Sequence, residues 1–172
     1  MTFKDIPQVK PNYLQIAKEA VSLIQENDVI YIPSTTLGLF MVKNLPEHLK
    51  IKVVTNSILI ADELRTLTDV SVIILGGEMD NKGNCCDTIA VETVKRLRLD
   101  KCFITSACIS ASFGLSIQST PYISFFNALI DSSKLTIGLY PKEKIGFDSI
   151  VSICPATVSY THLRAHETRH DL

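Results

Sequence analysis

The chain has 172 residues, 46% of them hydrophobic, and its 17 basic and 18 acidic residues leave a formal net charge of −1. That length suits one domain with a buried core and is short for two. Without a surplus of lysine and arginine, the chain is not expected to bind nucleic acid by itself. No apolar run is long enough to cross a bilayer, and no secretion signal begins the chain. The five cysteines form no C-x-x-C pair, which favours reduced thiols and a cytoplasmic location.

The spacing of apolar residues predicts helices and strands that alternate along the chain. In order, the predicted elements are helix 12–25, strand 29–32, helix 37–45, strand 51–54, helix 58–67, strand 70–75, helix 88–97, strand 101–105, helix 120–133, strand 135–139 and strand 149–154. Thr120 is expected to cap the helix at 120–133, with Pro121 in its first position. Because the strands are apolar on both sides, we expect an α/β fold with a mostly parallel sheet and helices on both faces.

Ligands of such sheets bind beyond the C-terminal ends of the strands, so the loops at that edge are the candidate site. Ser34, Thr35 and Thr36 lie between a strand and a helix. Unpaired N–H groups of a helix N-terminus, together with these hydroxyls, would suit a phosphate. The alternative is that Ser34 or Thr35 merely caps the helix.

The next two strands end in similar signals. Asn56 follows the second strand and could cap a helix or reach a ligand hydroxyl. Gly76 and Gly77 follow the third strand, where glycine permits either a close backbone approach to a ligand or a plain turn. No G-x-G-x-x-G and no Walker motif is present, so neither a dinucleotide nor a nucleoside triphosphate is indicated.

The segments IYIPSTT, VVTNS, ILGGEM and LDKCFITSACIS occur in this order. Together they resemble the C-terminal effector-sensing domain of DeoR/GlpR-family bacterial transcriptional regulators, over about Ile16 to Ile153. The resemblance implies a Rossmann-like fold related to sugar-phosphate isomerases, a homo-oligomer, and no catalysis or cofactor. It also implies that the domain belongs to a repressor of carbohydrate-metabolism genes and that its partner is a phosphorylated sugar. Binding of this sugar would change how the N-terminal helix-turn-helix of the repressor holds its operator.

Several loops depart from the family pattern. The first loop lacks the usual Asp and Gly, and Asp87, Thr105 and Cys108 stand where glycine is usual. The late Asp-Ser-Ser-Lys of the family aligns with residues 141–144, so only Lys144 is kept, and the literal Asp-Ser-Ser-Lys at residues 131–134 is a coincidence. The resemblance thus implies an altered ligand site that consists of Ser34, Thr35, Thr36, Asn56, Gly76, Gly77 and Lys144.

Two alternatives to a sensor domain remain open. A sugar-phosphate isomerase-like enzyme would need a positioned general base, for which the loops offer Glu78, Asp80 and Glu143 without a second acid–base partner. A degenerate sensor fragment would keep the fold and bind no ligand. Stabilisation of the protein by a sugar phosphate separates a working sensor from such a fragment.

Both ends of the chain are expected to lie outside the sensor domain, which we place at residues 12–157 and expect to be truncated. Residues 1–11 are too few for a helix-turn-helix, so DNA would be bound only through a missing N-terminal part. Back-translated, VSYTHLRAHET at residues 158–168 is similar to a transposase adapter of sequencing libraries, so residues 158–172 are expected to be non-native. His162, His166 and His170 are spaced as helical zinc ligands. The surrounding residues supply neither an apolar stripe nor further ligands, so no metal site is expected.

Overall fold

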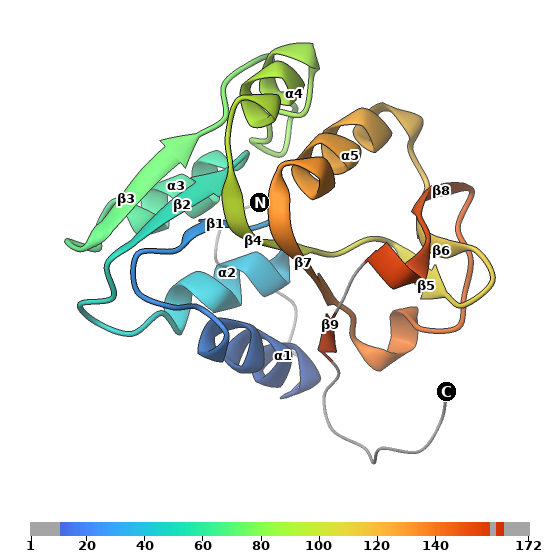
Figure 1. Cartoon of the computed structure of the whole chain (residues 1–172), viewed down its shortest axis with the longest axis horizontal. Helices are drawn as coiled ribbons and strands as arrows, with labels where there is room; N and C mark the ends of the chain where they lie inside the picture. Colours follow the sequence, from blue (N-terminus) through green and yellow to red (C-terminus); the bar gives the residue numbers. More distant parts are fainter. Residues whose placement is uncertain (1–10, 159–160, 164–172) are drawn as a thin grey trace.

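The computed structural model describes residues 11–158 and 161–163, and its helices and strands alternate along most of the chain (Figure 1). The helices are α1 (Pro11–Ser22), α2 (Thr36–Lys43), α3 (Ile58–Leu64), α4 (Thr88–Lys95) and α5 (Ile123–Asp131). The strands are β1 (Val29–Tyr31), β2 (Ile51–Thr55), β3 (Val70–Ile74), β4 (Leu99–Ile104), β5 (Cys108–Ser110), β6 (Gly114–Ile117), β7 (Ser133–Leu139), β8 (Val151–Cys154) and β9 (Thr161–Leu163). No helix in the described part of the chain is long and apolar enough to cross a membrane.

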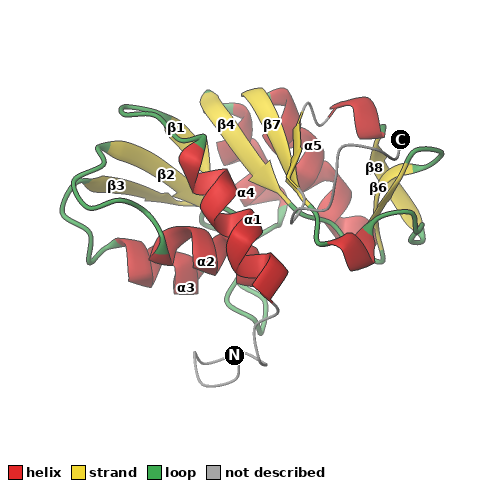
Figure 2. Ribbon diagram, turned by 90° about the horizontal axis from the view of Figure 1, so that it is seen from below, coloured by secondary structure: helices red, strands yellow, loops and turns green. Residues whose placement is uncertain are grey.

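Six parallel strands form the central sheet, in the order β3-β2-β1-β4-β7-β9. Helices α1, α2 and α3 lie on one face of this sheet, and α4 and α5 lie on the other (Figure 2). Alternate residues of one strand therefore enter different cores: Phe103 packs on the α1–α3 side, whereas Cys102 and Ile104 pack on the α4–α5 side. The predicted parallel sheet with helices on both faces is confirmed.

The chain leaves the central sheet after β4 and forms a second, antiparallel sheet in the order β5-β6-β8. The prediction that a strand at 149–154 closes the parallel series is therefore wrong, since Val151–Cys154 pairs with β6 instead. Glycine allows the hairpin turn: Gly114 has φ +76°, and a side chain there would collide with the carbonyl of Cys154. Leu115 and Ile153 bury this small sheet against the α4–α5 core.

Two local details also differ from expectation. Thr120 does not cap a helix but begins a single 3-10 turn, Thr120–Tyr122, after Ser119, whose side chain makes no capping bond. The second detail is strand β9, which falls within residues 158–172, the stretch expected to be non-native. It pairs with the strand β7 of the central sheet, and His162 lies opposite Gly138. The domain limit near residue 157 stays a prediction.

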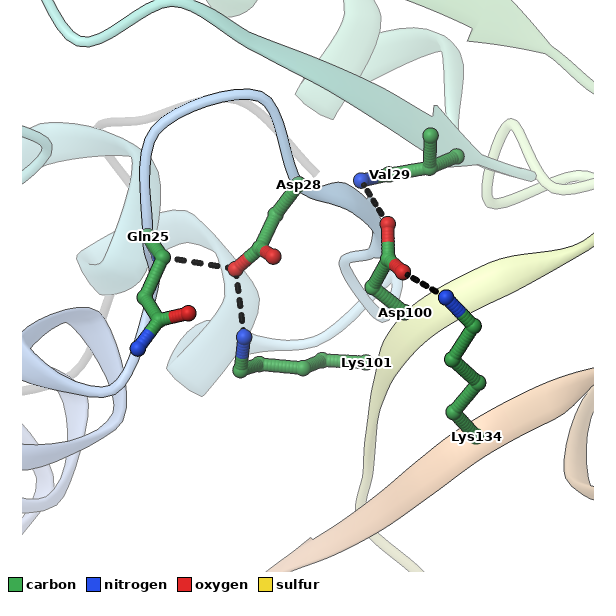
Figure 3. A network of polar contacts seen from close by, with 6 residues as sticks. All are labelled: Gln25, Asp28, Val29, Asp100, Lys101 and Lys134. Carbon is green, nitrogen blue, oxygen red and sulfur yellow. Dashed lines mark hydrogen bonds and ion pairs between the residues drawn. The ribbon is translucent and has the colours of Figure 1, made fainter.

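Charged residues tie three central strands together at the N-terminal edge of the sheet (Figure 3). Asp28, just before β1, accepts hydrogen bonds from the backbone N–H of Gln25 and from Lys101 of β4, the latter at 2.5 Å. The neighbouring Asp100 accepts the N–H of Val29 at 2.9 Å and the ammonium of Lys134, in β7, at 2.7 Å. This network lies at the edge opposite to the candidate ligand site.

Candidate functional site

The loop between β1 and α2 presents a helix N-terminus at the C-terminal edge of the sheet. Thr35 is the N-cap of α2, and its hydroxyl accepts the N–H of Gly38 at 3.3 Å. Its own N–H donates to the carbonyl of Pro33 at 2.8 Å. Thr36 and Leu37 are the first residues of the helix, so their N–H groups have no acceptor within it. Capping and anion binding are thus compatible here, because the cap uses one N–H and leaves others.

Gly38 brings α2 unusually close to the end of β1. A Cβ atom at this position would lie 1.9 Å from the carbonyl oxygen of Pro33 and 3.2 Å from a side-chain carbon of Ile32. Any residue other than glycine would push the first turn of α2 away from the strand. The sequence prediction missed Gly38, although its position three residues after the N-cap was a signal for close helix–strand packing.

Lys144 reaches the same edge from the 3-10 turn Lys142–Lys144 that follows β7. Its ammonium donates to the carbonyl of Ser106, just after β4, at 3.0 Å. The hydroxyl of Ser106 in turn shares a 2.9 Å hydrogen bond with Tyr140 and donates to the carbonyl of Cys108. Burial lowers the pKa of Lys144, an effect partly offset by Cys108 and Glu143. A partly buried cation thus lies beside the strand that neighbours β1.

Asn56 points inward rather than toward a ligand and is only 2% exposed. Its carbonyl oxygen accepts the hydroxyl of Tyr31 at 2.8 Å, and its amide donates to the thiol of Cys86 at 2.9 Å. Burial raises the pKa of Tyr31 well above its ordinary value and that of Cys86 to about 11, so both are protonated at neutral pH. Ser57, not Asn56, caps α3. The role of Asn56 as a ligand-binding residue stays a prediction.

The carboxylate of Asp87 occupies the space that a side chain on Gly77 would need. A side chain on Gly77, where φ is +132°, would lie 2.1 Å from an oxygen of Asp87. Asp87 caps α4 by accepting the N–H of Ala90 at 3.1 Å, and it also accepts the N–H of Glu78 at 2.9 Å. These N–H groups, that of Glu78 first, lower the pKa of Asp87, so it is an anion at neutral pH. A second anion at Gly76 and Gly77 would be repelled.

The sheet order divides the predicted site into two parts. Strands β1, β4 and β7 are neighbours, so the loop Ser34–Thr36 and Lys144 lie around the ends of adjacent strands. Gly76 and Gly77 follow β3, two strands away from β1, which is about 10 Å. The first part combines cationic and N–H groups, and the second carries the charge of Asp87.

The histidines of the C-terminal stretch take no part in this site. His166 and His170 lie outside the described residues, and His162 is placed only by its backbone in β9. Within residues 11–158 and 161–163, no cluster of His, Cys, Asp and Glu is arranged to hold a metal ion.

Solved structures share the fold at low sequence identity. Ribose 5-phosphate isomerase from Plasmodium falciparum is similar with a TM-score of 0.55 and 15% identity, over 77% of this chain and 52% of that chain. The delta subunit of eIF2B from Chaetomium thermophilum is similar with a TM-score of 0.60 and 14% identity, over 91% and 56%. At such identities the likeness concerns the fold, which is the one predicted, related to sugar-phosphate isomerases.

Sequence relatives are bacterial regulators. The HTH-type transcriptional regulator GolR of Listeria innocua is 25% identical, over 82% of this chain and 56% of the relative. The glycerol-3-phosphate regulon repressor of Haemophilus influenzae is 25% identical, over 80% and 54%. The lactose phosphotransferase system repressor of Lactococcus lactis is 32% identical, over 56% and 39%. This chain spans about half the length of the relatives that it matches.

The family comparison agrees with the fold and with these relatives. The model of the DeoR C-terminal sensor domain matches residues 12–161, which is most of the chain. The match includes the loops after β1, β2 and β4 and the turn that carries Lys144. The chain therefore belongs to the DeoR C-terminal sensor domain family.

Proposed function

We propose that this chain is the effector-binding module of a DeoR-type transcriptional repressor and that its effector is a phosphorylated sugar. The phosphate would bind at the N-terminus of α2, between the loop Ser34–Thr36 and Lys144. The module itself would act without catalysis or cofactor, in the cytoplasm of a bacterium. A helix-turn-helix in the part of the regulator beyond this chain would hold the operator DNA, and a homo-oligomer is expected.

One observation carries this proposal: N–H groups of α2 and a partly buried ammonium lie at the ends of neighbouring strands. Both types of group favour a compact anion. The burial that lowers the pKa of Lys144 also means that an incoming phosphate would relieve an unfavourable charge. The names of two relatives, which refer to glycerol 3-phosphate and to a lactose phosphotransferase system, point to the same class of ligand.

An isomerase is the weaker alternative, because Asp80 and Glu143, two of its three candidate bases, already accept hydrogen bonds within the protein. Asp80 accepts the backbone N–H groups of Lys82 and Asn84 at 2.8 and 2.9 Å, which lower its pKa. Glu143 accepts the side-chain amide of Asn12.

Thermal unfolding of the 172-residue chain with sugar phosphates tests the proposal. Ribose 5-phosphate, fructose 6-phosphate and glycerol 3-phosphate are compared with the unphosphorylated compounds. A ligand at about a hundred times its Kd adds about 2.7 kcal/mol to the free energy of unfolding, which is a rise in Tm of roughly 5–10 °C. Absence of a rise with every phosphate would refute a phosphate-sensing site, and turnover of aldose to ketose phosphate would favour the enzyme.

Two variants locate the site, each with a matched control. Thr36→Ala and Lys144→Met should each weaken binding about tenfold or more, because each removes a hydrogen-bond donor to an anion. Thr88→Ala changes the first residue of α4, and Lys142→Met changes an exposed residue of the turn that holds Lys144. Both controls should bind like the unmodified chain.

A further inference from the structure

Thr105, directly after β4, carries a buried hydroxyl with no hydrogen-bond partner among the described residues. The residue is only 7% exposed, and its Oγ1 atom is fully covered. An unpaired buried hydroxyl is unfavourable, and folded proteins rarely contain one without a reason. The neighbouring Ser106 shows the contrast, since its hydroxyl and its carbonyl both have partners.

The register of the sheet places Thr105 next to the candidate anion site. In the parallel ladders, Tyr31 pairs with Cys102 and Ile104 pairs with Gly138. Continued by one residue, the second ladder places Leu139 beside Thr105. On the other side of β4, β1 ends at Tyr31, and the loop that leads to α2 turns at residues 33–35. The same continuation pairs Ser106 with Tyr140, whose hydroxyl groups are indeed hydrogen-bonded at 2.9 Å.

The alternation of side chains indicates the face of the sheet on which Thr105 lies. Phe103 and Leu139 belong to the core on the α1–α3 side, and Cys102 and Ile104 belong to the other core. Thr105, two residues after Phe103, therefore faces the side on which α2 lies. Its side chain thus lies on the face on which the first turn of α2 begins.

The surrounding charge favours an anionic partner for this hydroxyl. Lys144 donates to the carbonyl of Ser106, the residue adjacent to Thr105. The first N–H groups of α2 follow β1, the strand that neighbours β4. The carboxylate of Asp87 lies over Gly77, at the end of a strand two places away from β1. A hydroxyl beside the residue that binds this ammonium, at the same end of the sheet as the N-terminus of α2, is suited to donate to a phosphate oxygen.

We infer that Thr105 is a ligand-binding residue of this sensor and that its hydroxyl donates to an oxygen of the bound phosphate. The inference rests on the proposed function and adds a contact that belongs to this chain's own β4 loop. The hydroxyl would therefore destabilise the unliganded protein, because it lacks a hydrogen-bond acceptor, and would gain that acceptor when the phosphate binds.

Thr105→Val tests both effects, because valine keeps the shape of threonine and lacks the hydroxyl. In the unliganded 172-residue chain, the variant should unfold at the same temperature or higher. Its Kd for ribose 5-phosphate, measured by calorimetry, should be about ten- to a hundredfold weaker. Inorganic phosphate, whose binding is followed by thermal shift, should lose affinity in the same way. Thr105→Ser keeps the hydroxyl and should bind within a few-fold of the unmodified chain.

The outcomes separate this inference from the proposed function. If the unmodified chain is stabilised by no phosphate, both fail. If it is stabilised and Thr105→Val binds equally well, the role of Thr105 alone is overturned. A clear fall in the Tm of unliganded Thr105→Val would mean that the hydroxyl already has a structural partner, which also overturns it. If Thr105→Val loses affinity for ribose 5-phosphate but not for inorganic phosphate, the hydroxyl does not bind the phosphate group, and the inference is overturned.

Discussion

The protonation of Lys144 is expected to control the proposed anion site. Burial lowers the pKa of its ammonium, while a bound phosphate would favour the charged form. In the unliganded protein the unfolded chain holds this proton more tightly than the folded chain. Lys144 therefore makes stability rise with pH across the window between its folded and unfolded pKa values.

The affinity for a phosphate should change with pH in the opposite direction. As the pH rises, Lys144 loses its proton. Because its pKa is lowered, binding should already weaken at pH values below the ordinary lysine pKa of about 10.4. Calorimetric titrations of ribose 5-phosphate between pH 7 and pH 10 measure this loss. Lys144→Arg, whose guanidinium stays protonated, should bind with no such decline. An unmodified chain that keeps full affinity at pH 10 would show that Lys144 is not the group that holds the anion.

At the scale of the element, α2 combines the helix N-terminus of the proposed anion site with a close contact to the end of its strand. Thr35 caps it, and Gly38 allows its first turn to touch the carbonyl of Pro33. The orientation of the free N–H groups is therefore set by a contact that only glycine permits.

Gly38→Ala should disturb this contact and the ligand site together. The added methyl group would lie 1.9 Å from the carbonyl oxygen of Pro33, so α2 must shift. We expect a loss of about 1–3 kcal/mol in the free energy of unfolding, from urea denaturation, and weaker phosphate binding. Gly76→Ala is the control for stability, because no atom lies within 4 Å of the added Cβ. Equal stability of the two variants would contradict the close packing.

At the scale of the molecule, the two edges of the central sheet have different roles. The C-terminal edge carries partly buried groups that suit a ligand, and the N-terminal edge carries the network of Figure 3. Lys101 and Asp28 are nearly buried there, with side chains 13% and 10% exposed, whereas Lys134 is 77% exposed. The network is thus expected to hold the strands together and not to take part in binding.

Lys101→Met should destabilise the fold without changing the site. It leaves the carboxylate of Asp28 buried without its cation, which costs about 3 kcal/mol. Lys134→Met, in the same network, should change stability little, because solvent screens exposed ion pairs. The midpoints of urea unfolding compare the two, and phosphate affinity should be unchanged in both. A loss of stability from Lys134→Met as large as that from Lys101→Met would argue against this division.

The sequence by itself determined the alternating helices and strands and the parallel sheet, because apolar periodicity and turn residues are local signals. The family was predicted from the resemblance of four short segments. The sequence also predicted that the loops with Ser34, Thr35, Thr36 and Lys144 lie together at the C-terminal ends of the strands, because every strand of a parallel sheet ends on that side. The outcome for two other residues and for one strand depended on partners distant in the sequence. Asn56 is held by Tyr31 and Cys86, Gly77 lies under Asp87, and Val151–Cys154 pairs with β6. Only the tertiary structure decided these contacts and left the Thr105 hydroxyl without a partner among the described residues, because the environment of a side chain is set by packing between separate elements.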